Sequence, residues 1–299
     1  MKKVFLFTIG LAITGLSYGQ YNKCAKQNVI EEEVAVEVYD EVTQSTKIVK
    51  RKQEVKGDSY GNAEGSQYDL AVDGAFKGQT IAVLHLYTGE GFDFSEPKEA
   101  LKQKGFSVYR WMNQPPTPEA LDSALAKSCQ LWIISSSTQK LNDEHAKVIK
   151  KFFDSGKGVY IWGDNQPYYA DANFIAQKLL GVSMQGNTMG NQTVNILSKG
   201  SKSGIMPNHL ITTGLQNVYE GITIATIDEH KDLTPIIYGS AGNLVAAAYE
   251  EDGKRLIFDG GFTRLYINWD TAGTGRYVKN AAAWLVNYER FGDKVVAIN

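Results

Sequence analysis

The stretch Gly158-Val159-Tyr160-Ile161-Trp162-Gly163-Asp164-Asn165-Gln166-Pro167 decides the fold class of this chain. Its first five residues are mostly β-branched or aromatic and predict a buried strand. The glycine and the polar residues before the proline predict a tight turn. In α/β sheets, the turn at the carboxyl end of a strand is where a nucleophile or a ligand contact commonly sits. Asp164 or Asn165 holds that position here, so this stretch indicates the fold more strongly than an activity.

Segments around this stretch alternate between strand and helix patterns. Strands are predicted at 80–87, 106–111, 130–135 and 158–162, and a helix follows each of them. Ser95, Thr117-Pro118 and Asn142 are typical helix starts, and Gly156 is a typical helix end. Four such units in succession predict an α/β fold with a mostly parallel sheet and helices on both faces.

The second half of the chain is richer in strand patterns. Further strands are predicted at 182–185, 193–197, 222–226, 235–238, 244–249 and 255–259. Asp252-Gly253 predicts a tight hairpin turn between the last two strands. Apolar residues at helical spacing predict a closing helix over 275–288.

The first 19 residues have the features of a secretory signal peptide. Lys2 and Lys3 precede an apolar run from Val4 to Leu16, and the small residues Ser17 and Gly19 suit cleavage after Gly19. The run is short for a bilayer span, which needs about 20 residues; an uncleaved anchor is the alternative. We therefore expect a protein exported to a bacterial periplasm or secreted, with no membrane span after cleavage.

Residues 20–77 form a charged arm and linker. An acidic run that includes Glu31, Glu33 and Glu37 is followed, after a polar turn, by a basic run that includes Lys50 and Arg51. Opposite charges across a hairpin favour pairing, although a two-stranded ribbon alone is marginal. The arm is thus either a hairpin docked on the main domain or a semi-ordered segment. The linker is predicted at 57–66, the main domain at 78–290 and a tail at 291–299.

Composition excludes several classes of partner and site. The chain has 299 residues, 43% hydrophobic and 21% charged, with a net charge of −2, so nothing favours nucleic acid or an anionic membrane. Cys24 and Cys129 could form a disulfide, but Cys129 abuts a predicted strand and fits a core position better. The four histidines lack metal-ligand spacing, and the glycine pairs lack a phosphate-binding pattern, so neither a metal nor a cofactor is expected.

Three segments together resemble a known family. Gly156–Asp164 matches a strand and elbow, and Asn208–Leu215 resembles a His-Pro-Ile-Thr-x-Gly-Leu pattern, with Leu210 in place of the proline. Phe258–Phe262 and the helix around Asn280–Leu285 resemble a closing strand and helix. The order of elements over 78–290 resembles the class I glutamine amidotransferase-like domain, and the second segment is similar to the related trehalose-utilisation-like proteins. The resemblance implies a flavodoxin-like three-layer sandwich whose fourth strand leads into the nucleophile turn.

The resemblance also shows what this chain lacks. Members with glutaminase chemistry need a Cys at the elbow and a His plus a Glu after the closing strand. This chain has Asp164 and Asn165 at the first place and Asp259, Gly260 and Gly261 at the second. Carboxylates do not replace a thiolate and an imidazole, so glutamine hydrolysis is excluded.

The carboxyl ends of the predicted strands define a candidate ligand site. The ligand-binding candidates there are His85, Thr88, Glu90, Ser136, Asp164, Asn165 and Arg264. The alternative is that such turns are simply polar, and for Arg264 a salt bridge to Asp259 or Asp270 is favoured. Asp164 and Asp259 could form an acid/base pair, or each could cap a turn. Aromatic residues near this edge suit either ligand stacking or ordinary packing: Tyr168, Tyr169, Tyr266, Trp269 and Tyr277.

Three functional hypotheses follow from these features. The first is an exported, non-catalytic binding or interaction module that takes a polar small molecule or a protein partner. The second is a hydrolase for a polar, sugar-like molecule, with Asp164 and Asp259 as acid and base. The third is a structural role in which the arm adds a strand to a partner's sheet.

Overall fold

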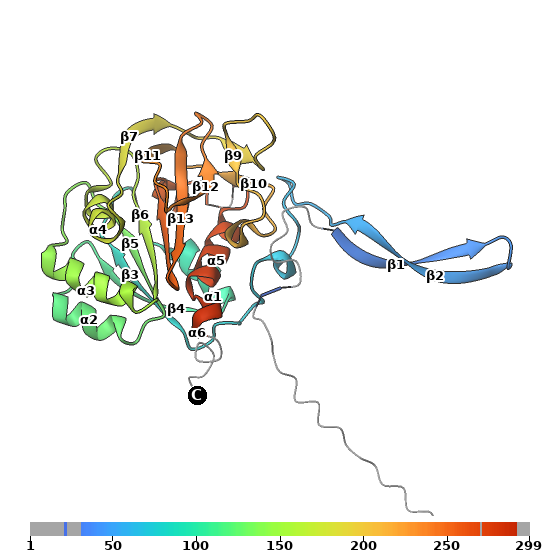
Figure 1. The fold of residues 1–299 in the computed structure, drawn as a ribbon, viewed down its shortest axis with the longest axis horizontal. Coiled ribbons are helices and arrows are strands. Elements are labelled where there is room, and N and C mark those ends of the chain that lie inside the picture. The colour runs from blue at the N-terminus through green and yellow to red at the C-terminus, as the bar shows by residue number, and fades with distance from the viewer. Residues whose placement is uncertain (1–20, 23–30, 270, 292–299) are drawn as a thin grey trace, which may run out of the picture.

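The computed structural model describes residues 21–22, 31–269 and 271–291 (Figure 1). The predicted signal peptide, Cys24 and nearly all of the predicted tail lie outside these residues. The central feature is an eight-stranded mixed sheet in the order β4-β3-β5-β6-β14-β13-β12-β9. Its parallel strands are β4 (Ser107–Met112), β3 (Thr80–His85), β5 (Gln130–Ile134), β6 (Gly158–Trp162) and β14 (Lys254–Asp259). The antiparallel strands are β13 (Leu244–Glu251), β12 (Thr234–Tyr238) and β9 (Gly204–Ile205).

Helices cover both faces of this sheet (Figure 1). On one face lie α1 (Ser95–Gln103) and α5 (Thr274–Leu285), and on the other lie α2 (Pro118–Leu125), α3 (Asp143–Asp154) and α4 (Ala170–Leu180); the short α6 (Tyr288–Phe291) follows α5. Side chains alternate along β3: Ile81 and Val83 pack in the core beside α5, whereas Ala82 and Leu84 pack in the other core. The predicted α/β sandwich is confirmed, and the parallel strands follow the flavodoxin-like order 2-1-3-4-5.

Helix starts follow the sequence signals in two cases out of three. Asn142 forms a capping box with His145 at α3, and the Thr117 hydroxyl accepts the Ala120 amide at α2. At α1 the predicted cap Ser95 is instead the first helical residue, because Phe94 takes the cap position in a left-handed conformation. Asp93 accepts the Ser95 amide and so stabilises this helix start from one residue further back.

The second half adds small antiparallel units above the carboxyl ends of the parallel strands. β7 (Met184–Met189) pairs with β11 (Thr223–Ile227), and β8 (Thr193–Asn195) pairs with β10 (Asn217–Tyr219). Short 3-10 turns occur at η1 (Ser66–Tyr68), η2 (Leu210–Thr212) and η3 (Phe262–Leu265). Asp252 and Gly253 both have positive φ between β13 and β14, as a type I′ hairpin turn requires.

The charged arm forms a two-stranded ribbon that extends away from the sheet (Figure 1). Its strands, β1 (Glu31–Asp40) and β2 (Ser45–Glu54), pair antiparallel with Val36 opposite Val49. Ion pairs cross it, such as Lys50 with Glu33 at 3.4 Å. The following segment lies on the domain instead of hanging free, since Asn62 and Asp69 in it are fully buried.

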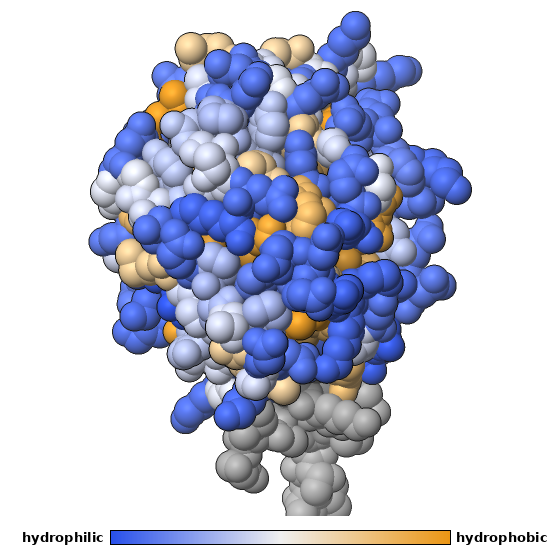
Figure 2. Space-filling model, turned by 90° about the vertical axis from the view of Figure 1, so that its left-hand side faces the viewer, coloured by the Kyte–Doolittle hydropathy of each residue, from blue (hydrophilic) through white to orange (hydrophobic). Residues whose placement is uncertain are grey.

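The surface beside α2 and α3 is dominated by hydrophilic residues with only small apolar patches (Figure 2). On the other face of the sheet, Cys129 is a free thiol buried next to the start of β5, in the core shared with α1 and α5. Within the described residues, none of the helices combines the length and apolarity needed to cross a bilayer.

Candidate functional site

A cavity of about 250 Å³ lies at the carboxyl ends of β3 and β6. The turns after these strands, the strand β11 with the residue before it, and η3 with the residues after it supply its walls. The lining residues are Tyr87, Glu90, Asp164, Asn165, Tyr168, Ile222, Thr223, Phe262, Thr263, Tyr266 and Ile267. Three of the seven predicted ligand contacts therefore meet here: Glu90, Asp164 and Asn165.

Asp164 forms the floor of the cavity. Its side chain is 1% exposed, and its two carboxyl oxygens accept the amides of Asn165 and Thr263, each at 2.8 Å. Burial raises the pKa of Asp164 to about 7, and the two amides, with the Arg264 charge further away, oppose that rise only in part. The carboxyl group consequently changes charge near neutral pH.

The side chain of Asn165 is occupied by hydrogen bonds within the protein. Its Oδ1 accepts the Thr223 hydroxyl at 2.9 Å and its amide donates to the Gln166 carbonyl at 3.0 Å. Neither Asp164 nor Asn165 has a positive φ, so this turn lacks the strained left-handed geometry that exposes a nucleophile. Asn165 thus acts as a brace between β6 and β11.

Glu90 and the aromatic residues close the opposite side. The Tyr266 hydroxyl donates to Glu90 at 3.0 Å, and the Tyr87 ring lies 5.1 Å from both Tyr168 and Phe262. Of the five predicted rim aromatics, Tyr168 and Tyr266 line the cavity. Tyr169 does not line it and packs instead against the core beside α4.

Asp259 is sealed away from the cavity. It is 0% exposed and binds Arg264, also fully buried, at 2.7 Å. It also accepts the Gly261 amide at 3.0 Å and the hydroxyls of Tyr277 at 2.9 Å and Tyr160 at 3.3 Å. Burial raises the pKa of Asp259 and the Arg264 charge opposes it; because a guanidinium does not deprotonate, we treat this pair as ionic at neutral pH. The salt bridge that the sequence favours for Arg264 is present, and neither Asp259 nor Arg264 lines the cavity.

His85 and Ser136 also lie outside the cavity, and Thr88 is exposed without lining it. His85 is buried 4.3 Å from the Phe92 ring, and burial, with the Arg110 charge, lowers its pKa to about 4. The Ser136 amide donates to Asp171, which also accepts two further amides in the loop before α3. These groups hold the loops around the site and do not contact its interior.

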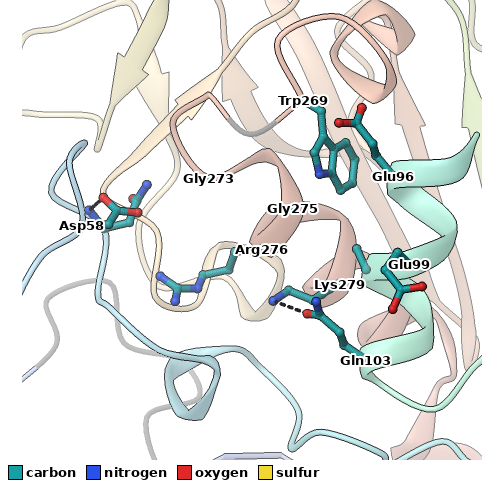
Figure 3. Close-up of a pocket in the computed structure, with 11 residues that line it drawn as sticks. Asp58, Glu96, Glu99, Gln103, Trp269, Gly273, Gly275, Arg276 and Lys279 are labelled. Atoms are coloured by element: carbon teal, nitrogen blue, oxygen red, sulfur yellow. Dashed lines mark hydrogen bonds between the residues drawn. The ribbon is translucent and has the colours of Figure 1, made fainter.

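A second cavity, of about 470 Å³, opens between α1, the start of α5 and the segment after the ribbon (Figure 3). Trp269 lines it, together with Arg276 and Lys279. Both cations bind the buried Asp69 at 2.7 Å, and Arg276 also donates to the carbonyls of Gly65 and Gly214. These charges are already paired, and they fasten the N-terminal segment to α5.

The sequence patterns did not point to Ile222, Thr223 or Ile267 as site residues. β11 belongs to a separate two-stranded sheet, so the rule that gathers the ends of parallel strands does not reach it. The sequence predicts a strand over 222–226, but nothing in its pattern places that strand beside β6. No group of three or more potential ligands suited to a metal ion occurs in the described part of the chain.

No protein-family model and no curated protein matches the chain. Among solved structures, a putative ThuA-like protein from Parabacteroides merdae gives a TM-score of 0.45 at 11% identity, covering 70% of this chain and 90% of that one. The glutaminase domain of Trypanosoma brucei CTPS gives 0.36 at 10% identity over 69% and 94%. An exo-β-1,4-mannosidase from an Opitutaceae bacterium gives 0.39 at 9% identity over 70% of this chain, which spans 36% of that protein. Scores this low carry no argument about activity.

Proposed function

We propose that this protein is an exported, non-catalytic binding module on an amidotransferase-like α/β domain, and that it binds a small polar molecule above Asp164. One observation carries the proposal: the cavity contains a buried carboxyl group and aromatic walls, but its lining includes no Cys, Ser, His or Lys. Covalent catalysis needs an activated nucleophile beside a base. The hydroxyl beside Asp164 is that of Thr263, which also accepts the Ile222 amide and is therefore held within the protein's own hydrogen bonds. Hydrogen-bonding and stacking groups alone suit binding.

The hydrolase alternative is less well supported. It needs Asp164 and Asp259 to face one substrate, but the oxygens of Asp259 are occupied by Arg264, Gly261 and two tyrosines. An acid/base pair requires both groups within reach of the reacting atoms. Asp259 does not line the cavity, so it cannot take that role without breaking a buried ion pair.

Cavity size limits the ligand. Sites for drug-sized molecules typically measure roughly 300–1,000 Å³, whereas this one measures about 250 Å³. A compact metabolite fits, and a long polymer could only insert an end. The exported location rests on residues 1–19 alone and is tested by sequencing the N-terminus of the protein recovered from the culture medium or periplasm.

A thermal-shift screen of the chain from Gln20 to Asn299 tests the binding proposal. Ligand in hundredfold excess over its dissociation constant adds about 2.7 kcal/mol to the free energy of unfolding. The shift should disappear in Asp164→Ala and Tyr168→Ala and persist in Asp228→Ala, an exposed carboxyl away from the cavity. A ligand that stabilises all variants equally, or turnover of any bound compound that Asp164→Asn abolishes, would contradict a non-catalytic site at Asp164.

A further inference from the structure

The walls of the Asp164 cavity are unusually aromatic for its size. Four of its eleven lining residues carry rings: Tyr87, Tyr168, Phe262 and Tyr266. Tyr168 stands nearly perpendicular to Tyr87, at 74°, and to Phe262, at 77°. Rings that meet at right angles present a face and an edge to a shared space, so the cavity offers negative π-faces to its contents.

The charge of the cavity is one-sided. Asp164 lies at the floor and Glu90 at the rim, while the lining contains no Lys, Arg or His. The nearby cation, Arg264, is fully buried and bound to Asp259. In the second cavity, the cations Arg276 and Lys279 form ion pairs with Asp69, whereas no cation in the lining of this cavity pairs with its carboxylates.

The ring positions are fixed before any ligand arrives. A Cβ on Gly89 would sit 2.6 Å from the Tyr87 hydroxyl, so only glycine lets that ring pack where it does. Tyr266 is held by its hydrogen bond to Glu90 and contacts Tyr87 at 6.4 Å between ring centroids. Because the walls are preorganised, little ordering entropy is lost when a ligand binds.

We propose that the ligand of this cavity is a small organic cation, such as a primary or quaternary ammonium compound, held by the aromatic rings and by Asp164 and Glu90. This rests on the proposed function, since it names the class of molecule that the same cavity binds. Aromatic faces and carboxylates both attract an organic cation. A neutral sugar would leave the carboxylate charge uncompensated, and the described residues place no group of three or more metal-binding side chains at this cavity.

Two probes of matched shape distinguish the organic-cation proposal from the broader proposal that the cavity binds a small polar molecule. Choline and 3,3-dimethylbutan-1-ol have the same shape and differ by one positive charge. Isothermal titration at pH 8 should show saturable choline binding and at least about tenfold weaker binding of the neutral alcohol. Equal binding of both, or binding of neutral polar compounds alone, overturns the cation proposal and leaves the binding module standing. No binding from either group, or from the wider screen, removes both.

Variants at Tyr266 test whether the rings hold the cation. Tyr266→Phe keeps the ring and loses the hydrogen bonds of its hydroxyl to Glu90 and Tyr87, so choline affinity should fall by less than about threefold. Tyr266→Leu removes the ring and should reduce the affinity by about tenfold or more. Tyr109→Leu, an exposed tyrosine on β4 that lies outside the cavity, is the control and should change nothing. Equal affinities for Phe and Leu variants would rule out a contribution from the ring.

The affinity should also depend on pH through Asp164. The groups that face this carboxyl are the amides of Asn165 and Thr263, the Arg264 charge behind it, and the phenols of Tyr87 and Tyr219, with Glu90 across the cavity. Tyrosine and arginine do not titrate between pH 5 and 8. Choline affinity should therefore rise by up to about tenfold from pH 6 to pH 8, as Asp164 loses its proton, and stay flat in Asp164→Asn. A pH profile that survives in this variant would overturn the role given to Asp164.

Discussion

Two carboxyl groups follow neighbouring strands of the same sheet and behave as opposites. Asp259 ends β14 and is bound by a guanidinium, two phenols and an amide. Asp164 lies two residues after β6 and is bound by two backbone amides and the Thr263 hydroxyl, all of them uncharged. Both are almost fully buried. The first is locked as part of an ion pair, and the second opens onto a cavity with a pKa of about 7. The same degree of burial therefore leaves the two carboxyl groups in different electrostatic environments, because only Asp259 is in contact with a cation.

We expect the largest effect from removing the cation that pairs with Asp259. Arg264→Met leaves Asp259 buried and unpaired, which typically costs about 3–5 kcal/mol of unfolding free energy. Urea unfolding at pH 7 measures the change. Replacing both partners, in Arg264→Met with Asp259→Leu, should recover much of the loss because no charge is left unpaired. A cost below about 1 kcal/mol for the single variant would mean that water reaches this pair.

The free energy of unfolding should depend on pH through Asp164, the carboxyl group that lines the cavity. The pKa of Asp164 is higher in the folded state than in the unfolded chain, so the folded state holds an extra proton between about pH 4 and 7. Stability from this group is present at low pH and is lost as pH rises through 7, by at most roughly 4 kcal/mol in all. Asp164→Asn should flatten that part of the curve, measured by urea unfolding at pH 4.5, 6 and 8. Asp228→Asn is the exposed control; an unchanged slope in Asp164→Asn would refute the assignment.

A smaller effect is expected from one phenol on the closed side. Tyr277 donates to Asp259 at 2.9 Å from the interior of α5. Tyr277→Phe deletes that hydrogen bond to a charged group, which is worth about 1.5–3 kcal/mol. Tyr168→Phe is the matched change on the open side, where no hydrogen bond from the phenol restrains Asp164, and it should cost less. Equal losses of unfolding free energy from the two variants would show that the surroundings of Asp259 and Asp164 do not differ in this way.

The smallest effect concerns the pKa of Asp164 itself. The Thr263 side chain donates to this carboxyl and lowers its pKa. Thr263→Val should therefore raise the pKa of Asp164 further, with only a modest loss of stability, since the Ile222 amide also loses its acceptor. Carboxyl carbon chemical shifts followed by NMR over pH 4–9 would record the change. A fall in the pKa would show that the hydroxyl is not a donor to Asp164.

The sheet could be predicted from sequence because its determinants are local. β-branched and aromatic runs, Asn142 and Thr117 at helix starts, and Asp252-Gly253 at a hairpin each specify their own neighbourhood. The failure at Ser95 has the same origin: its helix start depends on a left-handed Phe94, and that conformation has no signal in the residue type.

The site was harder, because it depends on contacts between distant residues. Asp164 could be picked out from its place after a strand, but its separation from Asp259 depends on Arg264 and Tyr277 choosing Asp259 as their partner. Thr223 reaches Asn165 from a separate small sheet, 58 residues later. Pairings of this kind are set by tertiary packing, which residue type and spacing do not encode.

The two edges of the β1–β2 ribbon carry opposite charges. One strand carries carboxylates and the other carries cations, and within the described residues neither outer edge is paired with another strand. A strand added to β1 is favoured if it is basic, and one added to β2 if it is acidic. Two such ribbons meeting edge to edge would join an acidic strand to a basic one and leave the same two edges free at the ends. A head-to-tail contact of this kind can be repeated by further copies and does not close into a dimer. Each contact would pair ten-residue strands over about 33 Å. The resulting chain of molecules would have two different ends, would be weakened by salt and would be detectable by sedimentation.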